Sequence, residues 1–402
     1  MRIQLWSYNY APEPLGIAPV SRAYALAMAE RGHQVEVVAA HPHYPEPRWG
    51  WRGRPYREVR EGIPILRLPL IPGRSSGARR ILQELSFTAS QTLATPFLGR
   101  PDVIVAVSPC FPALLPAMIA SRLRRVPLVI WLKDILPDGA VSTGYLSDGG
   151  LGMKLARRFE LAAYGAAAKV VVLSETFRDN LLSKGVPSQK IVRIYDPATR
   201  PLAAQPPDRS VKSDPPEILC MGNIGKSQNL PAIVRAFESN DDLAKIGARL
   251  VITGTGVAEP EVRAVVSTDR VSLEGLVSDE QLTQHLARAH LGAVTQHYEG
   301  AEFNVPSKVM NYLGAGLPVL ASVHPDGEIA KLLNTSNAGW VTNSEHPETF
   351  AEEAARVLTQ PDELQRRSRT ALEFARKHFS PSGLAESFEE MLQVLVSDSS
   401  PR

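Results

Sequence analysis

The sequence contains only two cysteines, Cys110 and Cys220, and each lies within an apolar run. A disulfide framework or a zinc site needs more thiols than this. Both classes of fold are therefore excluded, and the two cysteines are predicted to be buried thiols of the core.

Long apolar runs are also missing. No run reaches the 18 residues or more that a membrane-spanning helix needs, so no such helix is expected. The first residues, MRIQLWSYNYAPEPLG, lack the apolar stretch and the small-residue cleavage site of a signal peptide. A cytoplasmic location is therefore expected, and the balance of 44% hydrophobic and 21% charged residues is typical of a globular protein.

Charge is distributed unevenly although the net charge is only +2. Residues 1–200 carry 26 Lys and Arg and 15 Asp and Glu, a net charge of +11, which leaves 18 and 27, a net charge of −9, for the remainder. A basic half beside an acidic half indicates that the first half meets something anionic. The segment 48–80 is the densest, with nine arginines and the aromatic residues Trp49, Trp51 and Tyr56.

This basic segment continues into a stretch that places Leu82, Leu85, Ala89 and Leu93 on one helical face. Arginines and aromatic residues beside an amphipathic helix are typical of docking on anionic lipid. Residues 48–98 are therefore a hypothetical contact with an anionic membrane surface. The alternative is an ordinary half-buried helix beside a solvated basic loop. Nucleic-acid binding is not expected, because no recognition motif accompanies the arginines and the second half is acidic.

Strand and helix patterns alternate along both halves, which predicts doubly wound parallel sheets. A stretch with six prolines and no periodicity, 196–217, separates the halves and reads as an interdomain linker. The predicted organisation is a Rossmann-like domain at 1–197, a linker at 198–216, a second Rossmann-like domain at 217–382, and a helix and tail at 383–402 that cross back to the first domain. The ten predicted strands are 3–7, 35–39, 103–107, 128–132, 170–173, 218–221, 249–253, 271–274, 291–295 and 318–321.

Ligands of such folds sit at the carboxyl ends of the strands, and two facing domains would hold a ligand in the cleft between them. The first loop of the first half, 8–19, contains Gly16, which would let the backbone approach a ligand; a plain connector is the alternative. The first loop of the second half, MGNIGKSQNL, combines Gly222, Gly225 and Lys226 between a strand and a helix. This pattern indicates a phosphate site, with a tight turn and a solvated lysine as the alternative. The Gly-x-Gly of ITGTG, Gly254 and Gly256, fits a plain turn better when taken alone.

A third loop runs into the helix of FNVPSKVMNYLGAGLPVLAS, residues 303–322. Pro306 suits a first helical turn, and Ser307 and Lys308 follow it where backbone N–H groups lack partners and the helix dipole is positive. A lysine there disfavours the helix by a few tenths of a kcal/mol up to about 1 kcal/mol, which an anionic ligand would offset. The pattern predicts a phosphate or nucleotide at 306–311; a solvated lysine at a helix start is the alternative.

These stretches together carry a resemblance. In order, MGNIGKSQNLPAIVRAF, LVITGTG and VPSKVMNYLGAGLPVLASVHPDGEIAKLL resemble the C-terminal half of GT4-type glycosyltransferases of the GT-B fold. The stretches YNYAPEPLGIAPVSRAYALAMAERGHQVEVVAAHPHYP and WLKDILPDGAVSTGYL resemble the branch that builds colanic-acid-like exopolysaccharides. The resemblance implies two facing Rossmann-like domains and transfer of a sugar, with retention, from a UDP- or GDP-sugar in the second domain. The acceptor, lipid-linked or saccharide, is held mainly by the first. It implies no essential metal, and the sequence has no Asp-x-Asp motif of the metal-dependent kind.

The resemblance also assigns donor-site positions. Gly222, Asn223 and Gly225 match the loop near the donor diphosphate, and Asn223 stands where many relatives have arginine, so Lys226 is expected to take over the cationic role. Relatives often carry two glutamates around the Lys308 helix. Here these positions fall on Phe303 and Asn311, whose amide would bind a ribose hydroxyl without charge. Further carboxylates are expected from neighbouring positions of the same loops: Glu299 or Glu302, and Glu328 near the last donor-loop glutamate.

The expected chemistry is stabilisation of the leaving nucleoside diphosphate. Helix N-termini with Lys226 and Lys308 would stabilise the charge that grows on the β-phosphate. No dedicated nucleophile is evident, and in retaining relatives the leaving phosphate itself accepts the acceptor's proton. On the acceptor side we expect a polar contact from Asp134, which would otherwise cap the turn before Pro137.

The loop histidines His41 and His43 are expected to line the acceptor cleft, with mere solvation as the alternative. Two competing functions stay open at this point. A UDP-sugar 2-epimerase shares the fold but needs a set of acid and base residues that is not evident here. A degenerate, non-catalytic nucleotide-sugar-binding protein is favoured by the amides at Asn223 and Asn311.

Overall fold

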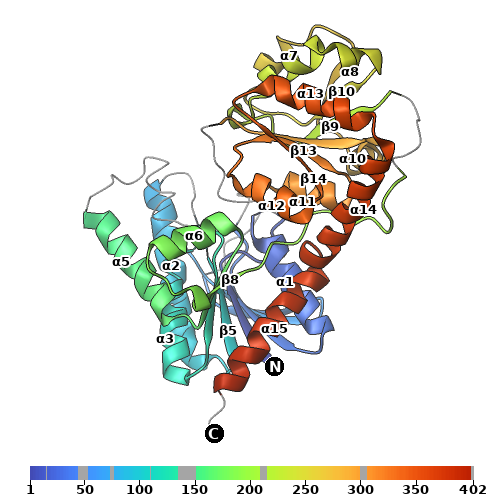
Figure 1. The fold of residues 1–402 in the computed structure, drawn as a ribbon. Helices are drawn as coiled ribbons and strands as arrows, with labels where there is room; N and C mark the ends of the chain where they lie inside the picture. Colours follow the sequence, from blue (N-terminus) through green and yellow to red (C-terminus); the bar gives the residue numbers. More distant parts are fainter. Residues whose placement is uncertain are drawn as a thin grey trace. The chain divides into compact units, whose positions relative to one another are not determined.

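The computed structural model describes residues 1–14, 16–43, 53–72, 77–108, 110–134, 151–208, 215–298 and 306–399. The chain forms two compact units, one of Met1–Pro197 with Pro381–Arg402 and one of Ala198–Ser380 (Figure 1). Within the described residues, none of the helices combines the length and the apolar character needed to cross a bilayer. Cys110 and Cys220 are free thiols and both are buried, as predicted.

The first unit is built on an eight-stranded sheet in the order β3-β4-β2-β1-β5-β6-β7-β8. Each pairing is parallel except that of β3 with β4, which is antiparallel. All five strands predicted for this half are present. β3, β4 and β8 were not predicted. The strands are β1 (Arg2–Ser7), β2 (Gln34–Ala40), β3 (Tyr56–Arg60), β4 (Ile63–Leu68), β5 (Val103–Val107), β6 (Leu128–Trp131), β7 (Lys169–Val172) and β8 (Ile191–Arg193).

Helices cover both faces of this sheet. The core on one face includes side chains of α1 (Ala18–Glu30) and α15 (Pro381–Ser399), so the last helix of the chain belongs to the first unit. The core on the other face includes side chains of α2 (Gly77–Ala94), α3 (Leu114–Arg124), α5 (Leu151–Ala166) and α6 (Glu175–Ser183). The short 3-10 helix η1 (Thr95–Phe97) follows α2, and η2 (Ser188–Lys190) precedes β8. Both faces of the sheet are therefore buried, as a doubly wound fold requires.

The first-unit core is rich in aromatic side chains where α15 packs. Phe388 of α15 places its ring 4.7 Å from that of Tyr24 and 4.8 Å from that of Trp131 at the end of β6. All three side chains are completely buried. Burying aromatic side chains of this size contributes several kcal/mol to the stability of a fold, so α15 is an integral part of the first unit.

The β3–β4 hairpin lies within the segment expected to be a basic membrane contact. Arg67 is completely buried, where its guanidinium donates to the carboxylate of Glu58 over 2.9 Å and to the carbonyl of Ala40 over 3.1 Å. Arg57 donates to Glu36 over 3.1 Å. Arg67 is thus part of the interior, which corrects its expected place in a lipid-facing basic segment, whereas Arg57 stays exposed on the edge strand β3. Trp49 and Trp51 lie outside the described residues.

Helix α2 turns its predicted apolar face outward. Leu82, Leu85 and Leu93 are 50%, 51% and 74% exposed, whereas Gln83 and Phe87 are buried against the sheet. The helix is therefore half-buried, as the alternative has it, but its leucine face is the exposed one. An apolar face in solvent calls for an explanation.

The second unit has a six-stranded, all-parallel sheet in the order β11-β10-β9-β12-β13-β14. All five predicted strands are present, and β14 was not predicted. The strands are β9 (Glu217–Met221), β10 (Arg249–Thr253), β11 (Val271–Gly275), β12 (Leu291–Thr295), β13 (Val319–Val323) and β14 (Gly339–Asn343). The helical elements are η3 (Lys226–Gln228), α7 (Leu230–Ser239), α8 (Asp241–Lys245), α9 (Glu259–Arg263), α10 (Asp279–Arg288), α11 (Ser307–Gly314), α12 (Glu328–Ser336), α13 (Pro347–Leu358) and α14 (Pro361–His378).

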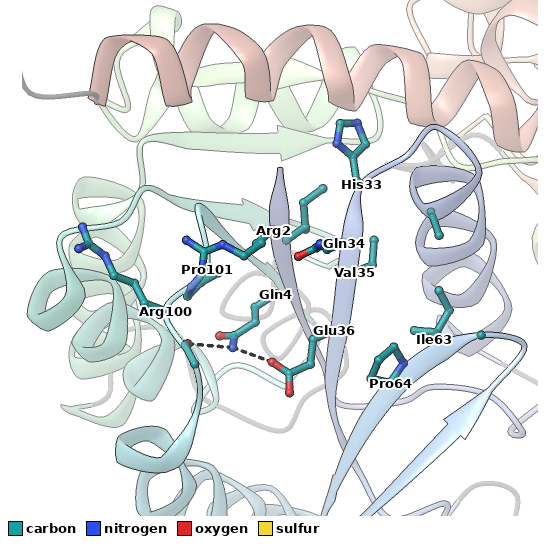
Figure 2. A pocket seen from close by; sticks show the side chains of 14 residues that line it. Arg2, Gln4, His33, Gln34, Val35, Glu36, Ile63, Pro64, Arg100 and Pro101 are labelled. Atoms are coloured by element: carbon teal, nitrogen blue, oxygen red, sulfur yellow. Dashed lines mark hydrogen bonds between the residues drawn. The ribbon is translucent and has the colours of Figure 1, made fainter.

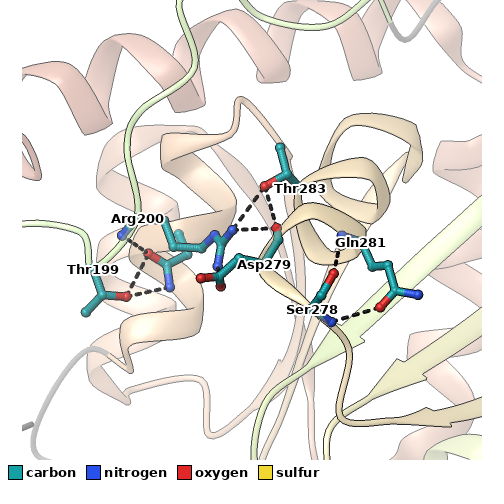
Figure 3. Close-up of polar contacts among 7 residues, drawn as sticks. Thr199, Arg200, Ser278, Asp279, Gln281 and Thr283 are labelled. Atoms are coloured by element: carbon teal, nitrogen blue, oxygen red, sulfur yellow. Dashed lines mark hydrogen bonds and ion pairs between the residues drawn. The ribbon is translucent and has the colours of Figure 1, made fainter. Parts of the chain in front are cut away.

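The first described part of the proline-rich segment, 198–208, lies along the second unit. The N–H of Ala198 donates to the carbonyl of Phe379 over 2.8 Å, and that of Ala203 donates to Gly314 over 2.7 Å. Figure 3 shows Arg200 reaching the start of α10, where it donates to Asp279 and Thr283 over 2.7–3.0 Å. This stretch is thus an ordered part of the unit.

Candidate functional site

Two loops at the carboxyl edge of the second sheet are joined backbone to backbone. The N–H of Gly222 donates to the carbonyl of Thr253, and that of Ile224 donates to Thr255, both over 2.9 Å. The N–H of Ala258, in the second loop, donates to the carbonyl of Ile224 in the first over 3.0 Å. The loop after β9 and the loop after β10 therefore form one rigid surface, at the edge where parallel α/β sheets bind ligands.

Glycine is required where these loops meet. A Cβ on Gly254, whose φ is +119°, would overlap the carbonyl of Gly222, and a Cβ on Gly256 would overlap the carbonyl of Ile224. The Gly-x-Gly that looked like a plain turn thus allows two backbones to touch. Gly222 itself has a φ of +105°, and its exposed backbone faces the Lys308 side chain, with Lys308 Cε 4.0 Å from the position its Cβ would take.

Lys308 extends from the first turn of α11 over the loop after β9. Its Nζ donates to Gln228 Oε1 over 3.1 Å, while Gln228 Nε2 donates to the carbonyl of Asn223 over 2.6 Å. Burial raises the pKa of the Cys220 thiol, and the Lys308 ammonium acts against that rise, which places its charge near the end of β9. Gln228 was not predicted to hold these groups, because a single glutamine in a turn carries no sequence signal.

Lys226 behaves differently. Its side chain is 73% exposed, and its ammonium lies 3.9 Å from the Glu261 carboxylate on α9. The two predicted lysines thus engage different partners, Lys308 against the glycine loop and Lys226 toward solvent. An exposed ion pair of this length contributes little to stability, so Lys226 is not held in place.

Two helices of the second unit begin with nothing to offset the positive end of the helix dipole or to cap their first N–H groups. Among its described helices, only α7 and α11 have neither a side-chain cap nor an acidic residue in the first turn. α10, by contrast, begins with a capping box of Ser278 and Gln281, which Figure 3 shows. Unpartnered N–H groups and a positive dipole end make a helix start an anion site. Both uncompensated helices follow strands at the ligand-binding edge, and both are next to Lys308 or the turn that holds it.

Buried polar groups lie at the same edge. Thr295 Oγ1 and Gln296 Nε2, at the end of β12, are buried and find no hydrogen-bond partner among the described residues. Glu328 is buried as the first residue of α12. Ser307 is exposed at the start of α11. Phe303, Glu299 and Glu302 lie outside the described residues.

Asn311 is engaged by the chain itself. Its Oδ1 accepts from Thr199 Oγ1 and from the N–H of Arg200, both over 3.2 Å, and its Nδ2 donates to Thr199 Oγ1 over 2.9 Å. The amide expected to meet a ribose hydroxyl therefore fastens α11 to the stretch around 199–200 in this structure.

The predicted acceptor-side residues are dispersed in the first unit. Gly16 has a φ of +65° and open space around its Cα. Asp134 is exposed just after β6, and Pro137 lies outside the described residues. His41 and His43 are each only 4% exposed, so they neither line an open cleft nor sit in solvent.

His43 belongs to a buried polar cluster after β1 and β2. The ring Nδ1 of His43 lies 3.3 Å from the Glu13 carboxylate, and the backbone N–H of His43 donates to the same carboxylate over 2.7 Å. Asn9 Nδ2 also donates to Glu13 over 2.9 Å, and the Tyr8 ring is 4.6 Å from that of His43. A buried carboxylate needs such partners, so the cluster fixes the loop that contains Gly16.

A cavity of about 510 Å³ lies at the opposite edge of the first sheet. Figure 2 shows Arg2, Gln4 and Glu36 among its lining, with Gln4 Nε2 donating to Glu36 over 2.9 Å. It lies at the amino ends of β1 and β2, whereas parallel α/β sheets bind ligands at the carboxyl ends. It is therefore not the predicted site.

Comparison with known proteins identifies the chain. Residues 16–196 match the family described as "Glycosyl transferase 4-like domain", and residues 215–360 match "Glycosyl transferases group 1". The protein belongs to the GT4-like glycosyltransferases. The resemblance noted in the sequence is thereby confirmed, and so is the assignment as an enzyme of sugar transfer.

Among its relatives is the Escherichia coli (strain K12) protein named "Putative colanic acid biosynthesis glycosyl transferase WcaI", 26% identical over 355 residues, which span 83% of this chain and 86% of that protein. Among solved structures, sucrose-phosphate synthase from Thermosynechococcus elongatus has a TM-score of 0.68 at 16% identity and covers 99% of this chain and 100% of its own. Anabaena HepE in complex with UDP and glucose has a TM-score of 0.60 at 16% identity and covers 98% and 100%. These structures confirm the GT-B fold class for this glycosyltransferase.

Proposed function

We propose that this glycosyltransferase transfers a sugar from a UDP- or GDP-sugar to a lipid-linked or saccharide acceptor in exopolysaccharide or cell-surface glycan synthesis, with retention at the anomeric carbon. The observation that supports it best is the loop surface of Gly222, Gly254 and Gly256 with Lys308 held over it. The name of the E. coli relative supports the pathway, and the UDP bound to Anabaena HepE supports the donor class.

The donor diphosphate would lie on the uncompensated starts of α7 and α11. Backbone N–H groups fixed at a helix start lose little entropy when an anion arrives, and the exposed backbone of Gly222 would let an oxygen atom approach closely. The start of α11 would supply most of these N–H groups, because Pro231 of α7 has none and those of Ala232 and Ile233 donate to Asn229. The Lys308 ammonium would exchange its neutral partner, Gln228, for a phosphate oxygen. The phosphate oxygen carries negative charge, so the exchange adds a Coulombic attraction that the Gln228 amide does not provide.

The same groups would lower the barrier. As the glycosidic bond breaks, negative charge grows on the β-phosphate, and donors that are already oriented toward it stabilise the transition state more than the ground state. Lys308 would supply most of this effect, with Lys226 as an exposed secondary cation. Thr295, Gln296 and Glu328 would contact the sugar or the ribose. Asp134 and the loop that contains Gly16 would position the acceptor, and the buried His43–Glu13 cluster would hold that loop in place. No metal is part of this scheme.

A screen of UDP-, GDP- and ADP-sugars tests the proposal. The purified protein should release a nucleoside diphosphate from one donor, faster when an acceptor is present, and NMR of the glycoside should show the donor's anomeric configuration. Tight donor binding without release would instead favour the non-catalytic binder. Conversion of a UDP-sugar to its 2-epimer without any acceptor would favour the epimerase.

A further inference from the structure

The helices α2, α3 and α5 form one layer on one face of the first sheet. α2 contacts α3, and α3 contacts α5 (Figure 1). The ring of Phe111, just before α3, lies 4.9 Å from that of Phe159 on α5. Their inward side chains belong to a single core. Their outward side chains therefore form a shared surface of the unit.

Large apolar side chains are concentrated on this surface. Leu82, Leu85 and Leu93 of α2 are joined by Phe97 of η1, which is 84% exposed, and by Ile119 and Leu123 of α3, of which Leu123 is 76% exposed. Single exposed leucines are ordinary, but a group of them over adjacent helices marks an interaction site. We name this set the α2–α3 apolar face.

Positive charge surrounds this face. Arg122 and Arg125 lie exposed at the end of α3, and Lys154 and Arg158 lie exposed on α5. The described acidic residues of these three helices are Glu84, which pairs with Arg80 over 3.1 Å, and Glu160, which is buried and pairs with Lys184 over 3.1 Å. The surface thus presents apolar side chains and cations without opposing carboxylates in solvent.

We propose that the α2–α3 apolar face and its basic border dock on an anionic phospholipid bilayer. Apolar side chains insert at the boundary of headgroups and acyl chains while arginine and lysine remain among the phosphates. An acidic protein partner would also suit the charge. The bilayer is favoured because Leu82, Leu85 and Leu93 are spaced along one exposed side of a helix beside arginine and lysine, the pattern of an interfacial amphipathic helix. The inference does not depend on the proposed donor.

Vesicle co-sedimentation of the full-length protein tests the inference. Vesicles of phosphatidylcholine alone are compared with vesicles that contain about 30 mol% phosphatidylglycerol, whose negative surface potential attracts basic segments. We expect binding only to the anionic vesicles, and weaker binding as the salt concentration rises. Binding equal to the phosphatidylcholine background would overturn the inference.

Matched variants locate the contact. Leu93→Glu should lower the partition constant about tenfold through lost insertion and added repulsion, and Arg122→Glu should lower it at least about fivefold. Leu276→Glu changes a leucine of the second unit that is 82% exposed, and Lys245→Glu changes an exposed cation of α8. Both controls should bind like the wild type.

If the controls lose as much binding as Leu93→Glu and Arg122→Glu do, the attraction is a general charge effect and the docking face is refuted. Because all four side chains are exposed, thermal unfolding should be unchanged and would reveal any folding defect. Donor release by Leu93→Glu in the absence of vesicles should equal that of the wild type, which separates failure of docking from failure of the proposed reaction.

Discussion

Replacing Lys308 by alanine tests the chemistry at the donor loop most directly. An ammonium about 4 Å from a unit negative charge gains about 4 kcal/mol at an effective dielectric constant near 20. If about half a unit of charge develops on the leaving phosphate, the transition state loses about 2 kcal/mol of stabilisation, which corresponds to a fall in kcat of about 30-fold. Weaker binding of the ground-state diphosphate should also raise KM.

The effect on folding should be much smaller. The described Lys308 side chain donates one hydrogen bond, to the Gln228 amide, and a bond from a half-buried charged donor contributes about 1.5 kcal/mol. Removing a cation from the start of α11 relieves its unfavourable interaction with the helix dipole, which stabilises the fold by about 0.3–1 kcal/mol. The difference leaves a net loss of about 0.5–1 kcal/mol, so the Tm should fall by only a few degrees.

The assay is release of nucleoside diphosphate from the donor found in the screen, with kcat and KM measured separately. Lys308→Arg should keep part of the rate because it keeps the charge, and Lys245→Ala, at an exposed lysine of α8, serves as the matched control. A Lys308→Ala enzyme whose kcat/KM lies within about twofold of the wild type would show that this ammonium does not stabilise the leaving group.

Four further outcomes are expected. Gly254→Ala should destabilise the second unit by about 2–4 kcal/mol and abolish donor binding, because its Cβ overlaps the Gly222 carbonyl; Gly275→Ala, at a φ of +68° with open space, should cost only about 1 kcal/mol by urea unfolding. Phe388→Ala should destabilise the first unit by about 3–5 kcal/mol and speed hydrogen exchange in α15; unchanged exchange would contradict the packing described. Burial raises the pKa of Tyr10 to about 12, so between pH 10 and 12 the unfolded chain loses this proton while the folded chain keeps it. The free energy of unfolding should therefore fall by up to about 2.7 kcal/mol over this range. In Tyr10→Phe the urea midpoint should depend less on pH between 10 and 12. Sugar transfer should persist in excess EDTA, since no step is assigned to a metal; a loss restored by Mg²⁺ would refute that assignment.

Nine of the ten predicted strands are central in their sheets, and the tenth, β11, is an edge strand. Apolar runs such as Val103–Val107 and Leu291–Thr295 are covered on both faces by helices, so composition alone reveals them. The strands that were missed lie at sheet edges or carry polar residues. β4 contains Pro64 and the buried Arg67, and β14 reads GWVTN. Edge strands are specified by pairing with distant residues, which a local pattern does not report.

The parts of the candidate site that depend on local backbone conformation could be predicted from the sequence. Glycine after a strand and lysine at a helix start pointed to the loops around Gly222 and Lys308, which the structure brings together. Side chains whose partners lie far along the chain were not predictable. His43 is buried against Glu13, and Asn311 is held by Thr199, 112 residues away. The spacing of Leu82, Leu85 and Leu93 predicted a helix, but it did not tell which way the helix faces, because the inward positions include glutamine.

The position of α15 has a consequence for the order of synthesis. Most of the first unit is translated first, yet Tyr24 and Trp131 are covered by Phe388, which is synthesised only after the entire second unit. While the second unit is being synthesised, Tyr24 and Trp131 of the first unit therefore lack the side chain that covers them. Domains generally fold as they emerge from the ribosome, so this unit is incomplete during that time. A chain truncated after residue 380 would therefore lack the helix that covers the core of the first unit. A fusion partner placed directly after α15 would be attached to the helix that completes this unit.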